Sequence, residues 1–104
     1  MARFDVYPNP DAADRGHIPF MLDIQSDFLE GLDTRVVIPL FLSSRFSTRV
    51  RNLNPALEVA GKAVVMDTAS IGAIPTSDLR RPVANLADRQ LDIQDALDTL
   101  FAGY

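Results

Sequence analysis

The sequence changes pattern along its length, from short apolar runs broken by turn residues to one helical repeat near its end. Phe20, Leu22 and Ile24 alternate with Met21, Asp23 and Gln25, which predicts a half-buried strand. Residues 36–42 form a nearly continuous apolar run that is rich in β-branched side chains and also predicts a strand. Pro39 cannot donate to a ladder, so this strand is expected at a sheet edge or with a bulge.

Further short strands are predicted on both sides of these two. Residues 4–7 alternate before the break at Asn9-Pro10-Asp11, and residues 57–59 and 63–66 flank a hairpin turn at Gly61-Lys62. Residues 71–74 form another short run, which Pro75 stops. Residues 31–33 read as a turn, and residues 43–55 as a loop with one helical turn. Short strands with frequent turns are typical of a small barrel.

The last part of the chain predicts a helix that starts near Asn85 or Asp88 and runs to about Phe101. Its apolar positions share one side of the helix, and they are Leu86, Ile93, Ala96, Leu97, Leu100 and Phe101. Its carboxylates lie on the opposite side, with Asp88, Asp92 and Asp95 in line and Asp98 at the edge. Leu91, on the acidic side, is the only hint of a further apolar contact. Strands followed by one helix predict an α+β fold with the helix packed on the sheet.

Length and composition limit the possible functions. A chain of 104 residues fits one domain, spanning 1–104, and its net charge of −4 favours a protein partner over nucleic acid. Because the chain has one His and no Cys, we expect neither a metal nor a cofactor. The sequence shows no signal peptide and no apolar stretch of membrane-spanning length, so we expect a cytoplasmic protein.

Catalytic motifs are absent from the sequence. A ribonuclease site could be drawn from Arg35, Asp23, Asp67, Thr68 and His17, because phosphate chemistry needs an acid, a base and a cation. These residue types occur in every protein and follow no motif here, and a lone histidine is usually an ordinary surface residue. We therefore predict no catalytic residues and no enzyme activity.

Two features at the end of the chain stand out physically. Asp95 and Asp98 fall in the last helical turns, where the helix dipole disfavours negative charge, whereas Asp88 and Asp92 read as a solvated face. The chain also ends in Phe101-Ala102-Gly103-Tyr104, although termini are usually polar. Gly103 could simply end the helix with Tyr104 packed as a lid, or Tyr104 could be an exposed aromatic anchor.

Several segments make the chain recognisable. They are FDVY at 4–7, LDIQSDFL at 22–29, RVVIPL at 35–40, MDTASI at 66–71, VANLADRQLDIQDAL at 83–97 and FAGY at 101–104. In this order and spacing, from Phe4 to Tyr104, the sequence resembles the CcdB family of toxin-antitoxin toxins. The resemblance implies an SH3-like β-barrel with a small extra sheet and a C-terminal α-helix, forming a homodimer.

The resemblance also implies partners. CcdB-type toxins bind the A subunit of DNA gyrase and trap the enzyme on cleaved DNA. A CcdA-type antitoxin blocks the toxin, and the complex represses its own operon by binding operator DNA through the antitoxin. By position, the gyrase-binding residues would be Phe28, Leu29, Asp95, Asp98, Phe101, Ala102, Gly103 and Tyr104. The antitoxin-binding residues would be Asn9, Asp11, Arg15, Phe28, Leu29, Phe101 and Tyr104.

One departure from the family pattern concerns the gyrase contact. The family has Trp where this chain has Ala102, and it has an aliphatic residue where this chain has Tyr104. A central aromatic anchor contributes about 2 kcal/mol or more to binding, so the loss predicts weaker poisoning unless Tyr104 compensates. Two alternatives stay open: a CcdB-like protein that binds antitoxin but no longer poisons gyrase, and an endoribonuclease of the MazF type, which shares the fold.

Overall fold

The computed structural model describes residues 1–102. Its strands are β1 (Asp5–Pro8), β2 (Phe20–Asp23), β3 (Thr34–Leu42), β4 (Ala56–Val59), β5 (Lys62–Met66), β6 (Gly72–Pro75) and β7 (Ala84–Asn85). Short 3-10 helices lie in the connections: η1 (Ala12–Asp14), η2 (Asp27–Leu29), η3 (Ser43–Arg45), η4 (Thr68–Ser70), η5 (Thr76–Asp78) and η6 (Ala87–Arg89). One α-helix, α1 (Gln90–Ala102), follows η6 directly.

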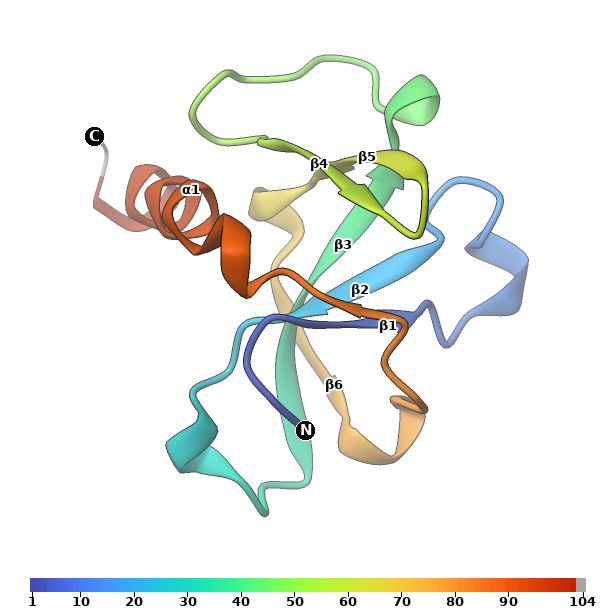
Figure 1. Ribbon diagram of the computed structural model, residues 1–104, viewed down its shortest axis with the longest axis vertical. Helices are drawn as coiled ribbons and strands as arrows, with labels where there is room; N and C mark the ends of the chain where they lie inside the picture. The colour runs from blue at the N-terminus through green and yellow to red at the C-terminus, as the bar shows by residue number, and fades with distance from the viewer. Residues whose placement is uncertain (103–104) are drawn as a thin grey trace.

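The strands form an antiparallel, nearly closed barrel that α1 flanks on one side (Figure 1). Their order is β4-β5-β3-β2-β1-β7, and β6 pairs with β3 outside this path. The α+β fold predicted from the sequence, a barrel with a C-terminal helix, is thereby confirmed. The expected extra sheet is here a single extra strand, β6.

Pro39 lies inside the sheet, which corrects the expectation of an edge strand. It pairs with Met21 of β2, while β5 pairs with residues 40–42 and β6 with residues 34–37 of β3. On the side of β3 that faces away from β2, Pro39 therefore lies between the residues that pair with β6 and those that pair with β5. Its carbonyl accepts from the Asp67 N–H at 3.0 Å, and its missing N–H costs no ladder bond there.

The expectation of a half-buried β2 is also wrong, because both faces of this region are covered. Phe20 and Leu22 face the main core, as the alternation predicts. On the other face Asp23 is fully buried and Gln25 is 6% exposed. A second apolar cluster of Tyr7, Val37 and Leu79 covers that face, and its members come from three separate segments.

The helix packs on the barrel through Ile93, Ala96 and Leu97, which join the main core with Leu86. Neither Asn85 nor Asp88 is the N-cap residue: this position is Leu86, which makes no side-chain cap bond, while Asn85 Oδ1 accepts from the Ala87 N–H at 2.8 Å. Phe101 was expected on the same apolar side, but it is 71% exposed. The core-facing part of the helix therefore ends before its last turn.

The β4–β5 hairpin turns at Ala60-Gly61, one residue earlier than predicted. Both residues have positive φ, 51° at Ala60 and 78° at Gly61, as the tightest hairpin turns require. The loop at residues 43–55 contains η3, as predicted, and returns toward α1 above the barrel (Figure 1). None of the helices in the described part of the chain is both long and apolar enough to cross a membrane.

Candidate functional site

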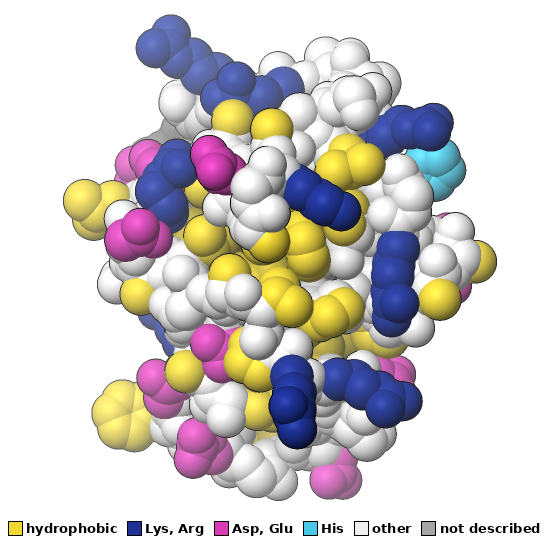
Figure 2. Space-filling model, turned by 45° about the vertical axis from the view of Figure 1, so that its right-hand side comes forward, with side chains coloured by type: hydrophobic (Ala, Val, Ile, Leu, Met, Phe, Trp, Pro, Cys, Tyr) yellow, Lys and Arg dark blue, Asp and Glu magenta, His cyan; other side chains and the backbone are white. Residues whose placement is uncertain are grey.

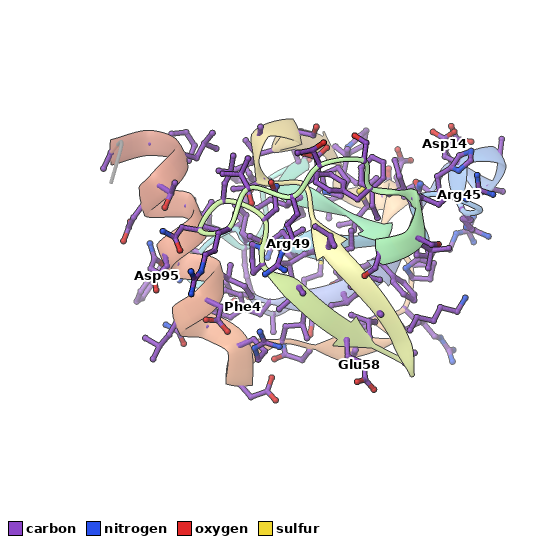
Figure 3. The ribbon with its side chains drawn as sticks, turned by 90° about the horizontal axis from the view of Figure 1, so that it is seen from above. Phe4, Asp14, Arg45, Arg49, Glu58 and Asp95 are labelled. Atoms are coloured by element: carbon purple, nitrogen blue, oxygen red, sulfur yellow. The ribbon has the colours of Figure 1, made fainter. Side chains whose placement is uncertain are left out.

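The last turns of α1 form an open acidic hollow against the loop before β4. Asp95 and Asp98 are exposed and, with Thr99 and Asn52, line a hollow of about 290 Å³. Figure 3 shows the position of Asp95 on α1. The carboxylates add to the negative end of the helix dipole, so this hollow favours a cationic group.

These carboxylates differ from those earlier in the helix. Asp92 forms a salt bridge with Arg89 at 2.8 Å. Within residues 1–102, neither Asp95 nor Asp98 has a basic partner; Asp98 accepts only a neutral hydrogen bond, from Gln94 Nε2 at 3.3 Å. An exposed carboxylate that lacks a basic partner can pair with a cation on another molecule.

Apolar side chains accompany the acidic hollow. Phe101 is 71% exposed and Ala102 is exposed, so the helix ends with an accessible ring. Gly103 and Tyr104, the other predicted gyrase-binding residues of this tail, lie outside the described residues. An aromatic ring beside carboxylates suits an arginine, which can stack on the ring and pair with an acid.

The second group of predicted gyrase contacts lies on η2. The Phe28 side chain is 99% exposed and Leu29 is 48% exposed. Ser26 caps this turn, because its Oγ accepts from the Phe28 N–H at 3.2 Å, and Gln25 Nε2 donates to the Leu29 carbonyl at 3.4 Å. Local hydrogen bonds thus hold an isolated phenylalanine in solvent, which is the usual geometry of an interface anchor.

The predicted antitoxin contacts after β1 form a compact loop. Asn9 is 2% exposed and serves the loop itself: its Nδ2 donates to the Ile18 carbonyl and its Oδ1 accepts from the Asp11 N–H. Asp11 caps η1 by accepting from the Ala13 N–H at 3.0 Å. Arg15 Nε donates to the Asn9 carbonyl at 2.7 Å. Asp11 and Arg15 are exposed, so they are the two members of this group that can reach a partner.

A hollow of about 390 Å³ lies beside this loop, lined by Pro8, Pro10, Arg15, Ser77, Asp78 and Arg80. Figure 2 shows a face of the molecule on which Lys and Arg side chains surround a band of apolar ones. The hollow beside η1 and η5 thus contains both charges, Arg15 and Arg80 together with Asp78.

A comparison with models of known protein families shows which family the chain belongs to. A family model described as the CcdB protein matches residues 3–103. The chain belongs to the CcdB family. CcdB proteins are toxins of CcdA/CcdB systems, and they are non-enzymatic. The two features singled out on physical grounds, the late carboxylates and the apolar tail, therefore belong to a member of a family of non-enzymatic toxins.

Three of the five residues considered for ribonuclease chemistry are buried in this CcdB protein. Asp23 and Arg35 form a buried salt bridge of 2.6 Å, and the buried Thr68 donates to the Leu53 carbonyl. His17 is exposed, as predicted. Residues 1–102 contain no cluster of three or more His, Cys, Asp or Glu side chains suited to hold a metal.

Sequence reasoning missed three residues near the candidate site. Met1 and Leu32 are 43% and 49% exposed and line a hollow with Glu30 and Gly31, the residues that follow η2. Asn52 lines the acidic hollow from the loop. An exposed apolar residue and an asparagine in a loop carry no periodic signal, so only the tertiary structure brings them to the site.

Proposed function

We propose that this chain is the toxin of a type II toxin-antitoxin system and that it binds the A subunit of DNA gyrase, poisoning it without catalysing a reaction. The proposal includes action in the cytoplasm as a homodimer. The observation that carries it is the end of α1, where the exposed Phe101 lies with two exposed carboxylates that have no basic partner among the described residues. Membership of the CcdB family supplies the target class.

The chemistry of this surface fits a basic protein segment. Phe101 and Phe28 are large rings that are 71% and 99% exposed, and interface hot spots are rich in aromatic residues that become buried on binding. Asp95 and Asp98 give the surface a negative charge, which steers a positively charged partner toward it. The gyrase-binding surface proposed here consists of Phe28, Leu29, Asp95, Asp98, Phe101 and Ala102, together with Gly103 and Tyr104 of the tail.

The antitoxin is proposed to cover part of the same surface. A CcdA-type segment that contacts Phe28, Leu29, Phe101 and Tyr104 would exclude gyrase by overlap. The same segment would reach Asp11 and Arg15, while the buried Asn9 holds that loop in shape. Because the toxin carries a net charge of −4, operator DNA is expected to be bound through the antitoxin alone.

The second candidate function is antitoxin binding without gyrase poisoning. It is favoured by one observation, Ala102, which stands exposed where the family pattern has Trp. A missing central aromatic can reduce affinity by more than tenfold.

The deciding experiment combines purified gyrase, supercoiled plasmid and the toxin, followed by denaturation of the enzyme. Accumulated linear DNA that disappears when the antitoxin is added supports the proposed function. Inert gyrase together with tight antitoxin binding supports the second candidate. Degradation of added RNA that is lost on Arg35→Ala, with gyrase unaffected, would contradict both and favour a MazF-type activity.

A further inference from the structure

The N-terminal segment contains a junction that links the two halves of the proposed gyrase-binding surface. Arg3 is partly buried and bonds to four separate segments. Its N–H donates to Asp27 Oδ1 (2.7 Å) and its carbonyl accepts from Asn85 Nδ2 (3.2 Å). Its Nε donates to the Ile24 carbonyl (3.1 Å) and its Nη2 to Gln94 Oε1 (3.5 Å). One residue therefore ties η2 and the strand before it to α1.

The connection continues along the helix to the acidic hollow. Gln94 Nε2 donates to Asp98 Oδ1 at 3.3 Å, one turn further on. A continuous path of hydrogen bonds thus runs from Asp27, the first residue of η2, through Arg3 and Gln94 to Asp98. Phe28 follows directly after one end of this path, and Phe101 lies one turn beyond the other.

We propose that Arg3 is a positioning residue that fixes η2 relative to the end of α1, so that Phe28 and Asp98 meet gyrase in one prearranged geometry. This inference rests on the function proposed above. Arg3 itself is not required to touch gyrase. Fixing the surface before binding raises affinity, because less conformational entropy is lost when the complex forms.

The local structure shows why η2 needs such a tie. None of the residues of η2 is buried, so the turn is held by polar contacts rather than by the core. The Arg3 guanidinium is itself fixed, since its Cζ lies 4.6 Å from the centroid of the Phe4 ring, which is buried beside α1 (Figure 3). Phe4 has a φ of 72°, a left-handed conformation that turns the chain sharply at this point.

An arginine is suited to this role because its planar guanidinium donates in several fixed directions at once. A lysine has a single ammonium on a flexible stem, so it can retain a bond to the Ile24 carbonyl or to Gln94 without fixing both. We therefore expect Arg3→Lys to rescue part of the effect of Arg3→Met. The backbone bonds of Arg3 to Asp27 and Asn85 remain in both variants.

The experiment compares Arg3→Met with Arg89→Met in binding to the purified gyrase A subunit. Arg89 is a matched control, because its side chain also makes two bonds, to Asp92 (2.9 Å) and to the Ala56 carbonyl (3.1 Å), at the opposite end of the helical segment. Arg3→Met is expected to bind the gyrase A subunit about tenfold more weakly than wild type. Losing one hydrogen bond made by a charged group has an effect of about this size. Arg89→Met is expected to bind like wild type, and the two variants should lose similar thermal stability.

Hydrogen exchange of the Phe28 and Leu29 amides provides the readout specific to positioning. Both amides donate within η2, to Ser26 Oγ and to the Ser26 carbonyl. They should exchange faster in Arg3→Met than in Arg89→Met. Weaker gyrase binding with unchanged exchange would mean that Arg3 contacts gyrase directly, which overturns the inference. Equal affinity of Arg3→Met and wild type would also overturn it while leaving the proposed function intact. Failure of the wild type to bind gyrase would overturn the proposed function, and the inference with it.

Discussion

Arg35 of β3 and Asp23 of β2 form a buried ion pair. Arg35 donates to Asp23 Oδ2 through Nη2 at 2.6 Å and through Nε at 2.9 Å, and the two side chains are 2% and 0% exposed. Burial raises the pKa of Asp23, and the adjacent Arg35 opposes that rise. The other carboxylate oxygen of Asp23 accepts from the Gln25 N–H at 3.0 Å. The pair therefore joins β2 to β3, and Arg35, although only 2% exposed, also lines the hollow beside η2.

Replacing one partner of this pair is expected to be costly. Asp23→Asn leaves the Arg35 charge buried without a counter-charge, so we expect a loss of about 3 kcal/mol in the free energy of unfolding, measured by urea denaturation. The control is Asp92→Asn, which breaks the partly exposed Arg89–Asp92 salt bridge of 2.8 Å and should cost less than about 1 kcal/mol. Equal losses in the two variants would contradict the structural role given to the buried pair.

Tyr7 should make the protein sensitive to alkali. Its ring is buried, and desolvation, followed by the charges of Asp5 and Asp23, raises its pKa to about 12. In the unfolded chain tyrosine ionises near pH 10, so the contribution of neutral Tyr7 is complete below that pH and is lost as the pH rises to 12. Across this window the free energy of unfolding of wild type should therefore fall by about 1.4 kcal/mol per pH unit more than that of Tyr7→Phe. Identical pH dependence of urea unfolding in the two proteins would refute the assignment.

Asp95 is predicted to lower the free energy of unfolding slightly while it raises the affinity for gyrase. Asp95→Asn removes a negative charge near the end of α1, so the free energy of unfolding should rise by a few tenths of a kcal/mol, about 0.3 or more. Gyrase affinity should fall and become less sensitive to salt. The control, Asp88→Asn, removes a charge from η6 at the start of the helical segment, where it should lower stability slightly and leave gyrase binding unchanged. A matched response of both variants in gyrase binding would speak against a specific role for Asp95.

Ala102→Trp tests the departure from the family pattern. Ala102 is exposed, so the larger side chain enters solvent and thermal stability should change little. A new aromatic anchor contributes about 2 kcal/mol or more to a protein interface, so the amount of toxin needed to produce linear DNA from gyrase and plasmid should fall by at least about tenfold. An unchanged requirement would show that Ala102 lies outside the gyrase contact.

The helix and every strand except β7 could be predicted, because their hydrophobic periods are local properties of the sequence. The burial of Asp23 could not, since the cover over its face is assembled from Tyr7, Val37 and Leu79, which are distant in the chain. Pro39 was misplaced for a related reason, because the succession of β6 and β5 along β3 is a long-range feature.

The candidate site shows the same division. The unusual charge and aromatic content of the tail could be seen in the sequence, but an exposed Phe28 could not be told from a core phenylalanine by pattern alone. Its assignment came from the resemblance to the CcdB family. The side-chain contacts of Arg3 reach residues 21 and 91 positions away, so nothing local in the sequence signals the junction.

The central claim, that η2 and the end of α1 together bind gyrase, is tested most directly by a cleavage assay on a doubly substituted toxin. Phe28→Ser with Phe101→Ser removes two rings that are 99% and 71% exposed, so the variant should fold with the melting temperature of wild type. With purified gyrase and supercoiled plasmid, wild type is predicted to accumulate linear DNA and the folded variant to accumulate none. Linear DNA at wild-type levels with the variant, or none with wild type, would contradict the account.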